Sequence, residues 1–358
     1  MLDVLFPHET DLDAWRDAFQ RGRTPGEWPH GLEALREVDP AATVGSLSEP
    51  TLGEKVRGRI LPRRRPLLAG GARRGGIGLT WDENAGRRLA LREPRQTMVT
   101  GVQWITDIVR EGRDPGRMRE VLRALDGLWV TSRGQVDALR AFVGDDGPRI
   151  AYFRAGVDSD FFRAEPFPSG DAPLVVSAGL DRHRDLATLY AAVEIVRDRM
   201  PWAQFVVQDE GSAGAAVPRG VTTFDRLDPD ELRDLHSRAW CFANATGDNL
   251  HASGHVVALE AMAVGRAVVL TRTPGIEDYV DDGRTGFLVP VGDAEALAER
   301  LLRTLEDRSL AVRLGQAARR SVEEDLTLRH FVDRLAGFAL SVAGLSLDEL
   351  VEDGRMGS

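Results

Sequence analysis

The stretch His251–Gly265, which reads HASGHVVALEAMAVG, joins small residues to an apolar run of helical period that contains one acid. Small residues at the start of a helix let backbone N–H groups approach a ligand closely. The first-turn N–H groups and the helix dipole favour an anion there. Glu260 is the only charge in the apolar run, and an acid in a nearly buried helix needs a partner. The stretch is therefore either an anion-binding helix start or a helix whose Glu260 is capped or salt-bridged within the protein.

Alternating strands and helices are expected to position this stretch, beginning with the N-terminal half. The strands expected there are 2–6, 42–44, 79–81, 98–104, 127–131 and 149–153. The helices expected there are 11–20, 31–38, 116–125 and 135–142. Such alternation predicts a parallel sheet covered by helices.

A second unit follows a segment of linker composition, 165–171. Its expected strands are 173–178, 204–207, 220–224, 240–243, 268–271 and 287–289. Its expected helices are 185–199, 229–239 with Asp228 as N-cap, 254–264, 293–305 and a last helix over 326–345. Two such units predict a cleft between them, with ligands at the carboxyl ends of the strands.

Composition sets the class of protein. The chain has 358 residues, so two domains are expected, and its 42% hydrophobic and 28% charged residues are typical of a soluble globular protein. We expect no membrane-spanning segment and no signal peptide, and a cytoplasmic location. Cys241 is the only cysteine, so neither a disulfide framework nor a cysteine metal site is expected. The net charge of −10 argues against nucleic acid as a partner. Lys55 is the only lysine, which suggests a GC-rich bacterial gene.

A basic segment, Arg57–Arg74, interrupts the alternation with seven arginines among prolines and glycines. One interpretation is a patch for anionic lipid or an anionic acceptor, with peripheral contact to a membrane. The other is a solvated loop on an acidic protein, which we prefer because the overall charge is negative.

The second unit resembles the donor domain of GT-B glycosyltransferases, in the retaining GT4-like family called glycosyl transferases group 1. Six pieces in family order carry the resemblance, over roughly residues 150–340. They are RAGVDSDFF (154–162), VVSAGLDRHRDL (175–186), FDRLDPDEL (224–232), VALEAMAVG (257–265), TRTPGIED (271–278) and DGRTGFLV (282–289). The fold that the resemblance implies is α/β, with two Rossmann-like domains facing across a cleft. The implied domains are an acceptor domain over 1–165, a nucleotide-sugar donor domain over 166–330 and a helix over 331–358 that crosses back.

The resemblance also implies a donor site. Arg184 stands where the family has a lysine and would offer several donors to the diphosphate, with help from Arg182. Glu260 would accept hydrogen bonds from both ribose hydroxyls. The other donor-binding residues implied are Gly179, Arg226, Leu227, His251, Ala252, Ser253, Gly254, His255 and Val256. The family generally works without a metal, so neither metal nor cofactor is expected.

Two departures from the family pattern concern the sugar and the phosphates. The family has an acid eight positions before Glu260, which contacts the sugar, and Ala252 stands there. The sugar contact would then come from Asp248, Asn249 or His251, or the sugar would lack a hydroxyl. The family's arginine after the strand glycine is also missing, because the sequence reads Ala178-Gly179.

The N-terminal half is expected to bind the acceptor. Several side chains lie just beyond its expected strands and would face the cleft, unless they are caps, core-edge aromatics or solvated residues. His8 and Gln103 are candidates for a catalytic role, together with Arg184. The candidates for acceptor binding are Glu9, Trp81, Asp82, Glu83 and Trp104.

These observations predict a retaining, metal-independent glycosyltransferase that uses a nucleotide-diphosphate sugar. Its acceptor is a secondary metabolite, a glycolipid or a polysaccharide. The alternatives are a GT-B pseudoenzyme that serves as a partner or scaffold, and a nucleotide-sugar hydrolase or epimerase in which His8 or His251 acts near the sugar.

Overall fold

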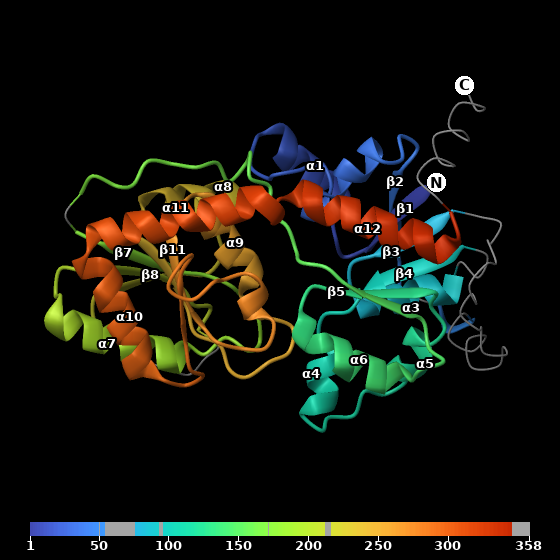
Figure 1. Ribbon diagram of the computed structural model, residues 1–358. Coiled ribbons are helices and arrows are strands. Elements are labelled where there is room, and N and C mark those ends of the chain that lie inside the picture. The colour runs from blue at the N-terminus through green and yellow to red at the C-terminus, as the bar shows by residue number, and fades with distance from the viewer. Residues whose placement is uncertain (50, 54–75, 93–95, 171, 212–215, 346–358) are drawn as a thin grey trace. The chain divides into compact units, whose positions relative to one another are not determined.

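The computed structural model describes residues 1–49, 51–53, 76–92, 96–170, 172–211 and 216–345. Its chain divides into two compact units (Figure 1). The first contains residues 1–20, 26–153 and 331–345, and the second contains residues 21–25 and 154–330. The sequence placed the corresponding boundary at residue 165. The basic segment Arg57–Arg74 lies outside the described residues. Among the described helices, none is long and apolar enough to cross a membrane.

The first unit is built on a parallel six-stranded sheet in the order β2-β1-β3-β4-β5-β6. Its strands are β1 (Leu2–Pro7), β2 (Thr43–Leu47), β3 (Ile77–Thr80), β4 (Thr97–Gly101), β5 (Gly127–Val130) and β6 (Arg149–Tyr152). Its α-helices are α1 (Leu12–Gln20), α3 (Glu83–Arg92), α4 (Ile105–Arg110), α5 (Met118–Leu122) and α6 (Val136–Val143).

Apolar residues from the sheet and from α3 to α6 form one core of this unit, which includes Leu89, Met98, Leu128 and Leu139. The other face carries rings that pack against α12 (Leu328–Ala343). The ring of Phe331 lies 5.7 Å from that of Trp81 and 5.6 Å from that of Trp129. The first unit is therefore completed by residues near the end of the described chain.

The second unit has its own parallel sheet, in the order β12-β11-β10-β7-β8-β9. Its strands are β7 (Leu174–Ser177), β8 (Gln204–Gln208), β9 (Val221–Phe224), β10 (Cys241–Asn244), β11 (Ala267–Thr271) and β12 (Phe287–Val289). Its α-helices are α7 (Leu186–Arg199), α8 (Pro229–Arg238), α9 (His255–Ala263), α10 (Ala294–Glu306) and α11 (Arg308–Asp325).

Alternation along the strands gives this sheet two apolar faces. Leu174 and Val176 of β7 point into a core with α8, α9 and α11, whereas Val175 points into a core with α7 and α10. Figure 1 shows helices on both sides of the strands in this unit. The expected class, α/β with two Rossmann-like units, is confirmed.

Some elements differ from the sequence-based expectation. Residues 31–38 do not form an α-helix, because η1 (Pro29–Glu37) is a 3-10 segment in which His30 and Gly31 have positive φ. β4 ends at Gly101 rather than at Trp104. A Cβ at Gly101 would lie 2.0 Å from the carbonyl oxygen of Trp81, so two segments of backbone meet closely there.

Candidate functional site

The loop after β7, residues 178–185, is held in shape by hydrogen bonds from the side chain of one of its own residues, Arg184. Its guanidinium donates to the carbonyl oxygen of Gly179 at 2.7 Å, to Ser177 Oγ at 2.9 Å and to the carbonyl oxygen of Gln208. Its buried Nε has no hydrogen-bond partner in the part of the chain that the structure describes. Burial lowers the pKa of Arg184 to about 10, so the side chain is still protonated at neutral pH. Arg184 therefore fixes the shape of the loop and places a positive charge under it.

A second loop, which follows β10, lies beside the first. The N–H of Asp185 donates to the carbonyl oxygen of Ala245 at 2.9 Å, and the N–H of Gly247 donates to that of His183 at 2.7 Å. Gly179, with φ +125°, donates its N–H to Gln208 Oε1 at 2.8 Å, and Gln208 Nε2 donates to the carbonyl oxygen of Asp225. The carboxyl ends of β7, β8, β9 and β10 are thus joined by hydrogen bonds.

The turn that leads into α9 has an unusual backbone. Gly254, at the N-cap, has φ +84°, and a Cβ there would lie 2.6 Å from Asn244 Nδ2, so the position requires glycine. Ala252 has φ +56° and is fully buried. The N–H of Ser253 donates to Asn249 Oδ1 at 2.9 Å, which engages that amide within the protein. The turn presents backbone at the start of α9, with a methyl group at position 252.

Asp181 connects the two loops. Its Oδ1 accepts hydrogen bonds from Ser253 Oγ at 2.8 Å and from the N–H of His183 at 2.8 Å. Its Oδ2 lies 3.0 Å from Nε2 of His251, which must be the donor if the carboxylate is ionised. Burial acts to raise the pKa of Asp181, but the hydrogen bond and charge of His251, with the bonds from His183 and Ser253, lower it well below its usual range. Asp181 is therefore an anion at neutral pH.

Two titratable side chains of α9 are held in their neutral forms. Burial raises the pKa of Glu260 to about 8, and its Oε2 is buried without a partner. Burial also lowers the pKa of His255 to about 4, and its Nδ1 lies 2.8 Å from the carbonyl oxygen of Ala252. Glu260 is neither capped nor salt-bridged by the described residues, so its partner-free oxygen is the feature of this helix that a ligand would satisfy.

Most of the remaining donor-site candidates have exposed side chains, and one packs against the apolar core. Arg182 and Arg226 are exposed, and Arg182 Nε donates to His183 Nε2 at 3.0 Å. Val256 is 46% exposed in the first turn of α9, while Leu227 packs against the core. The structure brings residues 179–184 together with 251–255 through Asp181 and the paired loops.

In the first unit, His8 and Glu9 follow β1 and lie against Arg88 of α3. Arg88 donates two hydrogen bonds to the Glu9 carboxylate, at 2.6 and 2.8 Å, and one to Glu49 at 2.6 Å. The hydrogen bond and charge of Arg88 lower the pKa of Glu9 to about 2. His8 Nδ1 lies 3.4 Å from the same guanidinium. A largely buried arginine therefore holds two half-exposed carboxylates at the carboxyl edge of β1 and β2.

The other acceptor candidates have structural roles in this unit. Glu83 accepts the N–H groups of Gln103, Trp104 and Ile105 at the start of α4. Asp82 accepts the N–H groups of two residues at the start of α3, and the ring of Trp81 stacks on that of His30 at 3.7 Å. The side chains of Gln103 and Trp104 are half-buried, and Gln103 Nε2 donates to the carbonyl oxygen of Trp81 at 3.4 Å.

Sequence reasoning missed Asp181, Gln208 and Arg88. Asp181 was visible as an acid between the strand glycine and two basic residues, a place where a charge has to be paired. Arg88 was hidden because it stands in ENAGRRLALR, where a buried arginine looks like a surface residue. Its burial became apparent only with Glu9 and Glu49 beside it.

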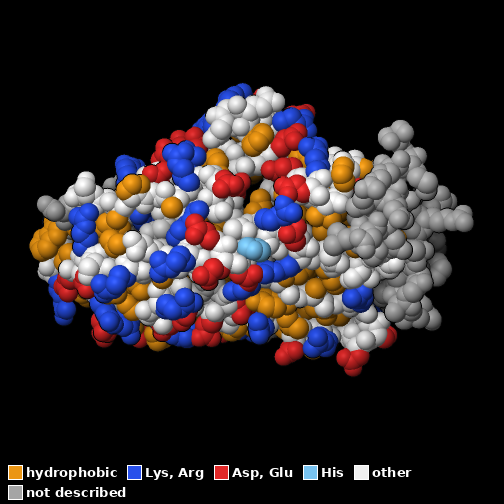
Figure 2. Space-filling view, turned by 45° about the horizontal axis from the view of Figure 1, so that its top comes forward, with side chains coloured by type: hydrophobic (Ala, Val, Ile, Leu, Met, Phe, Trp, Pro, Cys, Tyr) orange, Lys and Arg blue, Asp and Glu red, His pale blue; other side chains and the backbone are white. Residues whose placement is uncertain are grey.

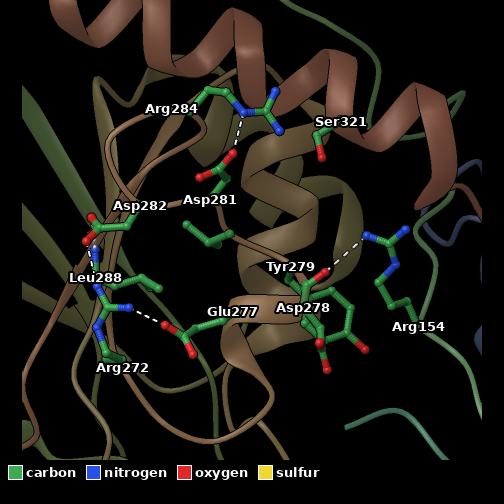
Figure 3. A pocket seen from close by; sticks show the side chains of 11 residues that line it. Arg154, Arg272, Glu277, Asp278, Tyr279, Asp281, Asp282, Arg284, Leu288 and Ser321 are labelled. Carbon is green, nitrogen blue, oxygen red and sulfur yellow. Dashed lines mark hydrogen bonds and ion pairs between the residues drawn. The ribbon is translucent and has the colours of Figure 1, made fainter. Parts of the chain in front are cut away.

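A polar cavity of 410 Å³ opens beyond β11 and β12, within the second unit (Figure 3). Several of its charged side chains pair with one another, namely Arg272 with Glu277 and Asp282, and Arg284 with Asp281. Charges of both signs also alternate over the face of the molecule shown in Figure 2, where neither sign forms a continuous field.

Comparison with known proteins points to one family. Residues 158–321 match the family described as glycosyl transferases group 1. The chain is 28% identical to the GDP-mannose-dependent alpha-(1-6)-phosphatidylinositol monomannoside mannosyltransferase of Mycobacterium tuberculosis, over 62% of this chain and 64% of that protein. It is 27% identical to the alpha-maltose-1-phosphate synthase of Mycolicibacterium smegmatis, over 60% and 63%. The matches span slightly less than two thirds of the length of these relatives.

Solved structures share the fold over nearly the whole chain. Sucrose-phosphate synthase from Thermosynechococcus elongatus superposes with a TM-score of 0.67 at 17% identity, over 100% of this chain and 99% of that one. HepE of Anabaena, in complex with UDP and glucose, superposes with a TM-score of 0.64 at 13% identity, over 94% and 98%. At these identities the likeness establishes the fold.

Proposed function

Since residues 158–321 match the group 1 glycosyl transferases and the chain has the GT-B fold, we propose that it is a member of that family and moves a sugar from a nucleotide-diphosphate sugar to an acceptor. The main support for the proposal is that the matched residues include the two hydrogen-bonded loops, after β7 and after β10, at the carboxyl edge of the second sheet. The relatives named above carry the names of different activities, so the acceptor of this chain is left as a small molecule or glycan.

The diphosphate belongs at the start of α9, beside the loop 178–185. The first-turn N–H groups of a helix favour an anion, and Gly254 lets the ligand approach the backbone there. Arg184 adds a positive charge beneath the loop, although its NH1 and NH2 groups are already engaged by protein oxygens. Arg182, which is exposed on the same loop, supplies a second charge. Arg184 thus acts mainly by positioning the loop.

The nucleoside belongs near Glu260. The buried, unpartnered Oε2 of Glu260 is suited to accept a hydrogen bond from a ribose hydroxyl. The base then extends toward Arg226 and Leu227, where the loop after β9 is tied to β8 through Gln208. We propose that backbone groups near these two residues read the base, so that side-chain identity does not reveal it.

Catalysis is proposed to be electrostatic and to retain the configuration of the sugar. As the bond to the diphosphate breaks, negative charge grows on the leaving group, and the α9 N-terminus with Arg184 stabilises it. The departing phosphate takes the proton of the acceptor, so the protein supplies no nucleophile and no metal. His8, Glu9, Gln103 and Trp104, with Trp81, Asp82 and Glu83 behind them, are proposed to form the acceptor side in the first unit.

A thermal-shift panel of UDP, GDP, dTDP and ADP tests nucleotide binding. A ligand at a hundred times its dissociation constant stabilises the folded state by about 2.7 kcal/mol, which is a visible shift. One nucleotide is expected to stabilise the wild type and to stabilise Glu260→Ala much less. If none of the four moves the melting temperature, the proposal fails and a non-catalytic scaffold is favoured.

Turnover distinguishes a transferase from a hydrolase. Nucleotide release from UDP-glucose and GDP-mannose is measured with and without an acceptor library, and with EDTA. A transferase releases nucleotide faster with acceptor, whereas a hydrolase releases it equally without. Arg184→Ala is expected to lower turnover by two or more orders of magnitude, while the exposed Arg303→Ala leaves it unchanged. The anomeric configuration of the product, read by NMR, tests retention.

A further inference from the structure

Position 252 offers no polar group, yet a carboxylate lies beside it. Ala252 is fully buried and has φ +56°, so its methyl group is packed within the turn. The residues on either side of it, His251 and Ser253, both bind Asp181, at 3.0 Å and 2.8 Å. The carboxylate of Asp181 is therefore fixed at the turn from the neighbouring loop, on the approach to the α9 N-terminus.

The Asp181 carboxylate is fixed by hydrogen bonds within the protein but can still accept another. It accepts bonds from His251, Ser253 and the N–H of His183, whereas its two oxygens have about four acceptor positions. The Asp181 side chain is 23% exposed, so part of it faces solvent. A further hydrogen bond to the ionised Asp181 carboxylate would come from water or from a ligand.

The chemistry of a nucleotide sugar indicates which of its parts can lie beside the Asp181 carboxylate. A carboxylate repels the diphosphate, so the phosphates stay on the N–H groups and arginines of the same edge. The sugar is neutral and carries hydroxyl donors, and a carboxylate with two oxygens suits adjacent hydroxyls. The part of a nucleotide sugar that fits beside Asp181 is therefore the sugar ring.

We propose that Asp181 is the residue that contacts the hydroxyl groups of the transferred sugar and selects for them. This inference rests on the proposed function of the second unit. His251 and Ser253 are positioning residues, which hold the carboxylate toward the ligand. An acid at position 252 is unnecessary in this arrangement, because the carboxylate is supplied from the loop after β7.

The test compares binding of two ligand pairs, UDP with UDP-glucose and GDP with GDP-mannose, by calorimetry on the full chain. Asp181→Asn keeps the size of the side chain but removes its charge and an acceptor oxygen. The variant is expected to bind the sugar nucleotide of the preferred pair about ten- to a hundredfold more weakly, the range for a hydrogen bond to a charged group. Its affinity for the corresponding nucleotide diphosphate is expected to stay within about twofold of wild type.

Two further variants make the result specific. Asp198→Asn, an exposed acid on α7, is the matched control and is expected to change neither affinity. Asp248→Asn tests the other exposed acid near the turn. Equal weakening of both ligands in Asp181→Asn, no weakening, or a selective loss in Asp248→Asn instead, would each overturn the inference but leave the proposed function standing, because the wild type still binds the nucleotide. Failure of the wild type to bind any nucleotide overturns both the inference and the proposed function. Melting temperatures of the variants establish that they fold.

Discussion

The carboxylate of Glu83 accepts a hydrogen bond from the backbone N–H of Trp104, at 2.9 Å. The same carboxylate accepts from Gln103 and Ile105, at 2.9 and 2.8 Å. One buried acid therefore accepts the N–H groups of the N-cap residue Trp104 and of Ile105, at the start of α4 where N–H groups lack helical partners, together with that of Gln103 just before them. A side chain just beyond β3 in this way fixes the loop just beyond β4.

Removing this acid is expected to destabilise the first unit. Glu83→Ala leaves three N–H groups without an acceptor and should lower the free energy of unfolding by about 2–3 kcal/mol. Glu83→Gln keeps a carbonyl oxygen and should cost about half as much. Urea unfolding followed by tryptophan fluorescence measures both. Glu120→Ala, at an exposed ion pair with Arg117, is the control and should cost less than about 1 kcal/mol. A cost for Glu83→Ala as small as this would contradict the role assigned here.

Arg266 gives a second stability test. It is 1% exposed and donates to four backbone carbonyl oxygens, those of His236, Ser237, Glu165 and Pro166. Lysine cannot reproduce this planar fork, so Arg266→Lys should destabilise the second unit by about 3 kcal/mol or more. Chemical denaturation measures the change, with the exposed Arg303→Lys as a control within about 0.5 kcal/mol of wild type. Similar values for the two variants would show that the four carbonyls find other donors.

His236 should make the protein sensitive to acid. Burial, followed by the charge of Arg266, lowers its pKa from 6.5 to about 3, and neither buried ring nitrogen has a hydrogen-bond partner among the described residues. Below pH 6.5 His236 becomes protonated in the unfolded state but stays neutral in the folded state. The free energy of unfolding therefore falls by up to about 1.4 kcal/mol per pH unit, down to about pH 3. His236→Phe, whose ring replaces the imidazole beside Phe242, should lose this component. Unfolding curves from pH 7 to pH 4 measure it, and equal slopes in the two proteins would refute the assignment.

Glu260 should act in the opposite direction. Its pKa is raised by burial from 4.5 to about 8, so between these values the folded state keeps a proton that the unfolded state has lost. The free energy of unfolding then falls as pH rises from 4.5 to 8, by at most about 1.4 kcal/mol per unit. Glu260→Gln mimics the protonated acid and should be more stable than wild type at pH 8, with the gap closing toward pH 5. Stability that rises in parallel for both proteins over this range would contradict a buried neutral Glu260.

The sequence allowed most of the second unit to be predicted, because its strands and helices have clear apolar periods. The expected strand at 287–289 and the N-cap at Asp228 both stand in the structure. The helix α3 was not expected, since Arg88 and Gly86 interrupt its apolar pattern. Arg88 is buried only because Glu9 and Glu49, from two other segments, neutralise it. Pairing between distant segments leaves no local signal, and the role of Asp181 was missed for the same reason.

The donor-site stretch shows what spacing can and cannot reveal. A helix start with small residues and a lone acid at Glu260 was apparent from HASGHVVALEAMAVG. The left-handed backbone at Ala252 and the bonds of the Asp181 carboxylate to His251 and Ser253 are tertiary features. Arg184 could be identified as a basic residue near the site, but its bonds to the carbonyls of Gly179 and Gln208 depend on how β7 and β8 pair.

The order of synthesis on the ribosome affects the two units differently. The second unit is almost continuous, over 154–330, whereas the first needs α12 from Phe331 onward to cover Trp81 and Trp129. A nascent chain can therefore finish the second sheet while the first still has an uncovered aromatic face. Until Phe331 emerges, the rings of Trp81 and Trp129 lack the aromatic partner that packs against them in the folded unit.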